Sequence, residues 1–205
     1  MTWNPMMFHL VEAYSELSML REAIGTAMKH KHDTKEFNEC LFYVRMEEAY
    51  HHVNTAWNCR HIDERRVWRC TEDDFRAWEK FPLDFKDLWL PPSRCRGKAH
   101  EVINGQLYFN LPQLHVGKAL AAIDGIFSSL GTDGLLPKDG KWRILMPMTE
   151  DAFAVHMRIL YICMNRAWNE RKVDSDGDYA PSATALRRHS CFPRAFSDLW
   201  PSREV

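Results

Sequence analysis

The chain has 205 residues, of which 45% are hydrophobic and 12% aromatic, enough to bury a core as one domain or two small ones. Its 27 basic and 28 acidic side chains nearly cancel, which argues against the broad positive field of a nucleic-acid-binding protein. No stretch approaches the roughly 20 apolar residues of a membrane span, and the first residues lack a signal-peptide pattern. We therefore expect a cytoplasmic protein without membrane association.

In chain order, the first predicted element is a helix from about Met6 to His30, where apolar residues recur at three- and four-residue steps. A second helix with the same spacing is predicted to run to about His61, and the two should pack as an antiparallel hairpin. Thr71, followed by three acidic residues, predicts the N-cap of a short helix that stops before Pro82. The first part of the chain is therefore predicted to be helical.

Two further segments have β character. Residues 101–109 are predicted to form a hairpin around Asn104-Gly105, because Asn-Gly favours a tight two-residue turn. Between 133 and 148 a five-residue insertion separates the paired helices of the second half, and Trp142–Met146 has the composition of a strand.

The sequence also contains two similar halves, and most of the similarity lies at an offset of 111 residues. Such an internal repeat constrains the architecture. The segment Phe81-Pro82 through Leu88-Trp89 returns as Phe192-Pro193 through Leu199-Trp200. The helical block also returns: Val44, Met46, Tyr50, Asn54, Ala56, Trp57, Asn58 and Arg60 recur as Val155, Met157, Tyr161, Asn165, Ala167, Trp168, Asn169 and Arg171.

The repeat predicts a mainly α-helical protein in which an internally duplicated helical hairpin forms a pseudo-twofold four-helix core, with extra short helices and a small β-hairpin. We assign residues 1–97 to the first helical repeat, 98–109 to the connecting β-hairpin and 110–205 to the second repeat, all packed as one intertwined domain. None of the six cysteines recurs at a repeat-equivalent position, so we expect reduced thiols rather than structural disulfides or a zinc site.

The repeated polar and aromatic residues have two interpretations. They can be core residues, with Asn54 and Asn165 bonding one another, since an unpaired buried amide costs about 1–3 kcal/mol. Alternatively they can line a central pocket for a flat, polar ligand. The two arginines lie at helix ends, where we expect them to pair with Asp87 and Asp198. The candidate ligand-binding residues are Tyr50, Asn54, Trp57, Arg60, Tyr161, Asn165, Trp168 and Arg171.

The halves differ most where the first carries acidic residues and histidines on its helices. Carboxylates and histidines on facing helices are typical of bundles that hold divalent metals, so this set predicts a metal cofactor and a metal-dependent hydrolase, with nucleotides as one substrate class. Most of these residues lie opposite the apolar stripes of their own helices, which favours the alternative interpretation of a solvated charged face. The candidate metal ligands are Glu12, Glu16, Glu48, His51 and His52. His9 and His115, the repeated histidines, are expected to cap or pack.

The second helix of the second repeat is apolar around most of its circumference between Ala152 and Met164. Ile159, Ile162 and Cys163 therefore need a cover, such as the inserted loop, the carboxy-terminal tail or a second subunit. No Gly-rich phosphate loop, nucleophile elbow or His-Glu-x-x-His motif is present. The leading prediction is a binding or regulatory module that engages a protein partner, or itself as a homodimer, through this asymmetric face of the second repeat.

Overall fold

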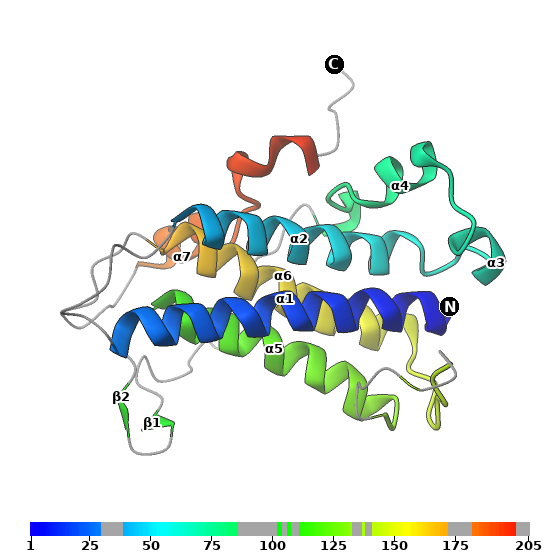
Figure 1. The fold of residues 1–205 in the computed structure, drawn as a ribbon, viewed down its shortest axis with the longest axis horizontal. Helices are drawn as coiled ribbons and strands as arrows, with labels where there is room; N and C mark the ends of the chain where they lie inside the picture. Colours follow the sequence, from blue (N-terminus) through cyan, green and yellow to red (C-terminus); the bar gives the residue numbers. More distant parts are fainter. Residues whose placement is uncertain are drawn as a thin grey trace.

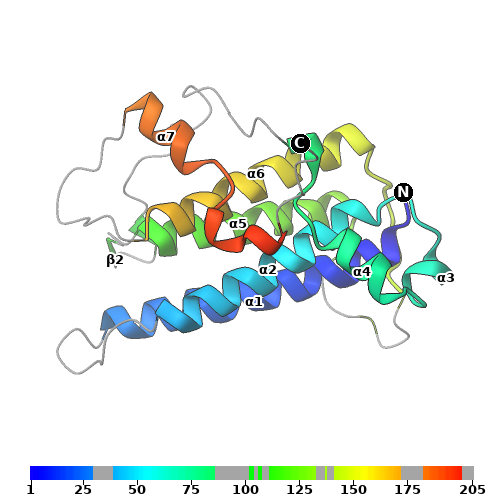
Figure 2. The ribbon, with the colours of Figure 1, turned by 90° about the horizontal axis from the view of Figure 1, so that it is seen from above.

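The computed structural model describes residues 1–29, 39–85, 102–103, 106–107, 111–132, 137, 141–171 and 182–199. It confirms a mainly α-helical protein. The four longest helices of the described chain lie side by side (Figures 1 and 2): α1 (Trp3–Lys29), α2 (Glu39–Asn58), α5 (Leu111–Ser129) and α6 (Glu150–Asn169). None of the described helices is both long and apolar enough to cross a membrane.

The bundle consists of two helical hairpins. Helix α1 packs on α2, α5 packs on α6, and α1 also contacts α5. The α1/α2 pair is antiparallel, because His9 lies opposite His52 while Glu16 lies opposite Arg45. The apolar stripes expected from sequence face the core and are buried: Leu10, Leu17, Leu20 and Ile24 on α1, and Phe42, Met46, Tyr50 and Trp57 on α2.

Shorter elements follow each hairpin. After α2 come α3 (Glu64–Val67), α4 (Glu72–Trp78) and the 3₁₀ turn η1 (Leu83–Phe85). After α6 come α7 (Ala183–His189) and the 3₁₀ segment η3 (Arg194–Leu199). In Figure 1, α4 and η3 lie on the same side of the bundle, next to α2.

The predicted N-cap at Thr71 is confirmed. Its hydroxyl accepts a hydrogen bond from the Asp74 amide at 3.2 Å, and Asp74 Oδ2 accepts one from the Thr71 amide at 3.2 Å. This reciprocal capping box satisfies amides that a helix start leaves without partners. As expected, α4 ends before Pro82.

The β structure is limited to two short strands in the described chain. Strand β1 (Val102–Ile103) pairs antiparallel with β2 (Gln106–Leu107); the other residues of the predicted 101–109 hairpin lie outside the described residues. The strand predicted at Trp142–Met146 is wrong, because backbone amides there bond to helix α1 and to the end of the α5 segment instead of to a strand. The Trp142 amide donates to Asn4 Oδ1 at 3.1 Å, and the Leu145 amide donates to the Leu130 carbonyl at 3.0 Å.

Candidate functional site

Two buried hydrogen bonds join α2 to α6 at the centre of the bundle. Tyr50 donates its hydroxyl to Asn165 Oδ1 at 2.6 Å, and Tyr161 donates its hydroxyl to Asn54 Oδ1 at 2.7 Å. The expectation that the two asparagines bond one another is therefore wrong. Each amide oxygen accepts from a tyrosine of the opposite helix, since the long tyrosine side chain carries its hydroxyl across the interface and leaves the amide nitrogen available for another partner.

The amide nitrogens hold the chain at the ends of α4 and α7. Asn54 Nδ2 donates to the Glu79 carbonyl at 2.5 Å, and Asn165 Nδ2 donates to the Ser190 carbonyl at 2.6 Å. Both acceptors are the C-cap residues of their helices, and the last carbonyls at a helix C-terminus have no intrahelical partner. Asn58 and Asn169 repeat the pattern one turn later, donating to carbonyls on either side of the same C-caps.

Aromatic rings complete this central region. Trp57 packs on Phe85 and Trp168 on Phe196, each at 4.6 Å between ring centroids. Trp57 is 3% exposed and Trp168 5%, while Tyr50, Tyr161 and both asparagines are fully buried. Burial raises the pKa of both tyrosine hydroxyls well above the ordinary value. The geometry therefore places six of the eight candidate ligand-binding residues in the core, where a ligand would have to displace packed side chains.

The other two candidates, Arg60 and Arg171, stack on the tryptophan rings. Each guanidinium lies 3.9 Å from the ring centroid of the tryptophan three residues earlier and donates to that residue's carbonyl at 2.9 Å. Arg60 also pairs with Glu150 at 2.9 Å. The expected partners, Asp87 and the side chain of Asp198, lie outside the described residues.

The structure separates the predicted metal ligands of the first repeat. Glu16 pairs with Arg45 at 2.7 Å, and His51 faces Glu79 with 3.4 Å between Nδ1 and Oε2. In the described part of the chain, no three or more His, Cys, Asp or Glu side chains already stand together as a metal-binding group. The predicted five, Glu12, Glu16, Glu48, His51 and His52, therefore do not form one assembled site.

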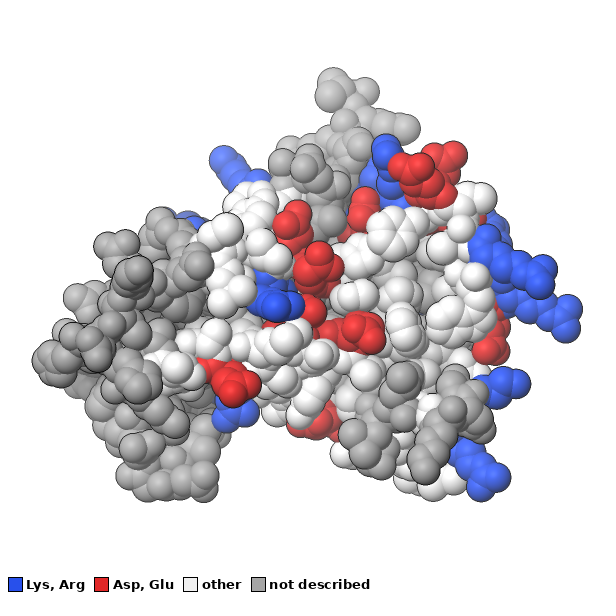
Figure 3. Space-filling model, in the orientation of Figure 1, with Lys and Arg blue, Asp and Glu red and all other residues white. Residues whose placement is uncertain are grey.

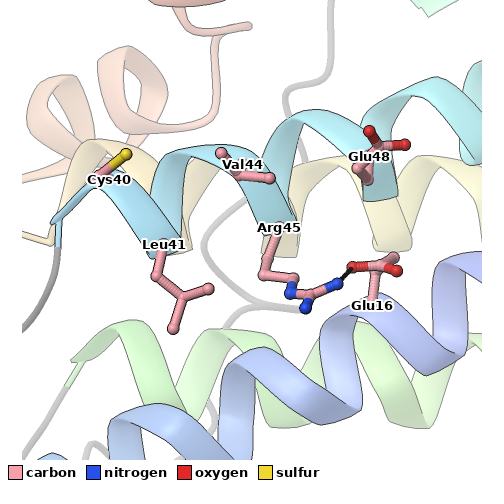
Figure 4. Close-up of a pocket in the computed structure, with 6 residues that line it drawn as sticks. All are labelled: Glu16, Cys40, Leu41, Val44, Arg45 and Glu48. Atoms are coloured by element: carbon pink, nitrogen blue, oxygen red, sulfur yellow. Dashed lines mark hydrogen bonds and ion pairs between the residues drawn. The ribbon is translucent and has the colours of Figure 1, made fainter.

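Two of the five, Glu16 and Glu48, instead line the outer seam between α1 and α2. Acidic side chains gather over this face (Figure 3). An open pocket of about 470 Å³ lies along it, lined by residues that include Glu16, Arg45 and Glu48. Figure 4 shows the Glu16–Arg45 ion pair beside Leu41 and Val44 of the same pocket. The seam thus combines charged groups with a small apolar patch.

His9 and His52 meet farther along the same seam, with 3.2 Å between their Nδ1 atoms. Burial, together with the neighbouring histidines, lowers the pKa of His9 to about 3 and that of His52 to about 4. Both rings are therefore neutral near pH 7. The spacing of Glu12, Glu48 and His52 indicated this seam from sequence, but His9 was expected only to cap or pack.

A buried His–Glu–His cluster lies at the opposite hairpin and was missed by sequence reasoning. Glu170 accepts from His115 Nε2 at 2.8 Å and bonds His189 Nδ1 at 3.0 Å. Burial lowers the pKa of His115 despite the neighbouring carboxylate; for Glu170 burial raises the pKa, but the bonds from the histidines outweigh it and the net shift is downward. One sequence signal could have indicated this cluster: Glu170 and His189 occupy the positions that are equivalent to Cys59 and Trp78 of the first half.

Helix α6 has an exposed apolar stripe on its outer face. Val155 is 56% exposed and Ile159 37%, whereas Ile162 and Cys163 are buried. Part of the face expected to need a cover is therefore already enclosed, and the uncovered part is confined to the first half of the helix.

No protein-family model, curated protein or solved structure matches this chain.

Proposed function

We propose that this protein is an interaction module that binds a second copy of itself through the outer face of α6. The observation that carries the proposal is the exposure of Val155 and Ile159, one helical turn apart, on a helix whose second half is buried. Exposed apolar side chains grouped on one helix face are a feature of protein–protein contacts.

A self-complementary pattern supports the choice of a second copy as partner. Val155 lies at the centre of five exposed residues that share one face of α6 at 100° per residue: Asp151, Ala152, Val155, Arg158 and Ile159. If two α6 helices cross antiparallel at Val155, Ile159 of one chain meets the small Ala152 of the other. The same crossing brings Asp151 against Arg158 of the second copy, and the twofold axis repeats both contacts.

The corresponding face of α2 lacks this complementarity. At the equivalent positions Val44 occupies the centre and is flanked by Glu47 and Glu48 on one side and by Cys40 and Leu41 on the other. An antiparallel crossing at Val44 would offer no oppositely charged group to Glu47 or Glu48. The proposed function therefore belongs to the second repeat alone.

We also propose that the two halves are copies of one ancestral hairpin. The repeated sequence and matching contacts support this. Tyr50 and Tyr161 make equivalent hydrogen bonds. Arg60 and Arg171 stack on equivalent tryptophans. One copy kept a charged outer face, and the other acquired the apolar stripe of α6. Divergence of this kind supplies a binding surface without disturbing the shared core.

The contact predicts a weak, concentration-dependent dimer. A stable dimer usually buries about 800 Å² on each partner, more than the α6 stripe offers by itself. Leu145 and Met146, in the loop before α6, are further exposed apolar side chains. Sedimentation equilibrium of the full chain from about 10 μM to about 1 mM covers the range in which such a dimer should form.

The variants test the stripe and its charges separately. We expect Val155→Glu to weaken self-association more than about tenfold, or 1.4 kcal/mol, whereas Val44→Glu, at the equivalent position on α2, should leave it unchanged. Arg158→Asp should weaken the dimer, and adding Asp151→Arg should restore it by exchanging the pair. A chain that stays monomeric across the range, or a dimer equally sensitive to Val44→Glu, contradicts the proposal and leaves α6 for a different partner.

A further inference from the structure

A second feature, independent of α6, lies on the seam between α1 and α2. Two neutral histidines, His9 and His52, point the same ring nitrogen at each other, with 3.2 Å between the Nδ1 atoms. They come from different helices, so the bundle itself sets their separation. One ring donates a proton to the other in this arrangement, and the pair sits at a depth where both rings are partly shielded from water.

The separation matches that of two nitrogens bound to one metal ion. Zinc–imidazole bonds of about 2.0–2.1 Å in tetrahedral geometry place the two nitrogens roughly 3.3 Å apart. For both Nδ1 atoms to bind one metal ion, both rings must carry their proton on Nε2 and turn so that the two Nδ1 lone pairs converge on the ion; each imidazole then stays neutral. The neutral imidazole is the form of histidine that binds a metal.

Two carboxylates flank the histidine pair. Glu12 follows His9 by three residues on α1, and Glu48 precedes His52 by four on α2, so each lies one turn along its own helix on the same face. Among the described residues, neither carboxylate makes a hydrogen bond or ion pair, in contrast to Glu16, which pairs with Arg45. Two carboxylates on facing helices favour a cation between them.

We propose that His9 and His52 bind one divalent transition-metal ion of the zinc type, with Glu12 or Glu48 completing the coordination by rotation of its side chain. Imidazole nitrogens select zinc-like ions over magnesium and calcium, which prefer oxygen ligands. Because His51 turns toward Glu79 and Glu16 toward Arg45, these two residues are outside the site. The site therefore differs from the five-residue set expected from sequence.

The first test is a zinc titration of the metal-free full chain by calorimetry, with magnesium as the comparison ion. We expect one zinc per chain and no response to magnesium. His52→Gln and His9→Gln should each weaken zinc binding more than about tenfold. His51→Gln, a neighbouring histidine outside the proposed site, is the matched control and should leave the affinity unchanged.

Nuclear magnetic resonance of the histidine side-chain nitrogens locates the ion and distinguishes the proposed site from exposed cysteine thiols, a ligand type that zinc also accepts. Zinc should move the Nδ1 signals of His9 and His52 and leave those of His51 and His115 in place. The double variant Glu12→Gln with Glu48→Gln, which alters only side chains on the outer seam, keeps the test valid if a histidine variant fails to fold, and it should also weaken binding. Absence of zinc binding, unchanged His9 and His52 signals, or an equal loss in His51→Gln overturns the proposal.

Discussion

Tyr50 of α2 donates a buried hydrogen bond to Asn165 of α6 at 2.6 Å, and the pair formed by Tyr161 and Asn54 reverses the direction at 2.7 Å. All four residues are fully buried. Because water cannot replace either partner at this depth, the two bonds favour one alignment of the hairpins over alternatives that would leave polar atoms unpaired.

Tyr50→Phe and Tyr161→Phe should each lower the free energy of unfolding by about 1–3 kcal/mol, because each leaves an asparagine oxygen buried without a donor. Urea denaturation measures the loss. A double-mutant cycle of Tyr50→Phe with Asn165→Ala should give a coupling energy of at least about 0.5 kcal/mol. The same cycle between Tyr50→Phe and Asn54→Ala, residues of different bonds, is the control and should show less coupling.

Stability should fall as the solution is acidified below about pH 6.5, and His115 should contribute to the fall. The unfolded chain takes up a proton on histidine near pH 6.5, whereas burial lowers the pKa of His115 in the folded protein. Its contribution is therefore complete above pH 6.5 and is lost as the pH falls toward the folded pKa. The lowered pKa of Glu170 adds a second loss that begins only below about pH 4.5.

Thermal melting of His115→Gln and the parent chain between about pH 7 and pH 5 isolates this contribution. The variant should be less stable at pH 7 but should lose less stability on acidification, since glutamine does not titrate. His9 and His52 titrate in both proteins and cancel in the comparison. Parallel pH profiles would show that His115 does not carry the predicted effect.

Two glycine-to-alanine substitutions should change the stability of the fold in opposite directions. Gly131 has φ of +70°, and an added Cβ would lie 2.9 Å from Leu145 Cβ, so Gly131→Ala should destabilise the protein by at least about 1 kcal/mol. At Gly117, inside α5, the nearest atom that the added Cβ would meet outside its own helix backbone is Arg21 Nε at 3.9 Å, so Gly117→Ala should stabilise by about 0.5–1 kcal/mol. Chemical denaturation of both variants tests the pair, and equal signs would contradict it.

Cysteine labelling should separate exposed from buried thiols. Cys40, Cys70 and Cys191 are exposed, whereas Cys59 is buried and its pKa is raised to about 12 by burial. Because the thiolate is the reactive form, Cys59 should resist iodoacetamide in the folded protein at pH 8 and react after denaturation. Mass spectrometry of the labelled peptides measures this, and rapid labelling of native Cys59 would refute the assigned burial.

Features determined by neighbouring residues were predictable from sequence. The apolar spacing of α1 and α2 reports a helical face directly, and the Thr71 capping box depends on residues only three positions apart. The same local reasoning failed at Trp142–Met146, because strand composition does not ensure a strand without a neighbour to pair with. It also assigned His51 to the metal set, although a one-residue step turns a helical side chain by about 100° and sends it toward Glu79.

What the sequence by itself determined was the helical content, the start of α4 and the repeated pattern of residues, because each of these depends on local spacing or can be read by comparing the chain with itself. Only the tertiary structure decided the partners: Asn54 with Tyr161, His9 with His52, and Glu170 with two histidines. These contacts join residues 19 to 107 positions apart, and their geometry depends on helix packing and rotamers, which no local pattern encodes.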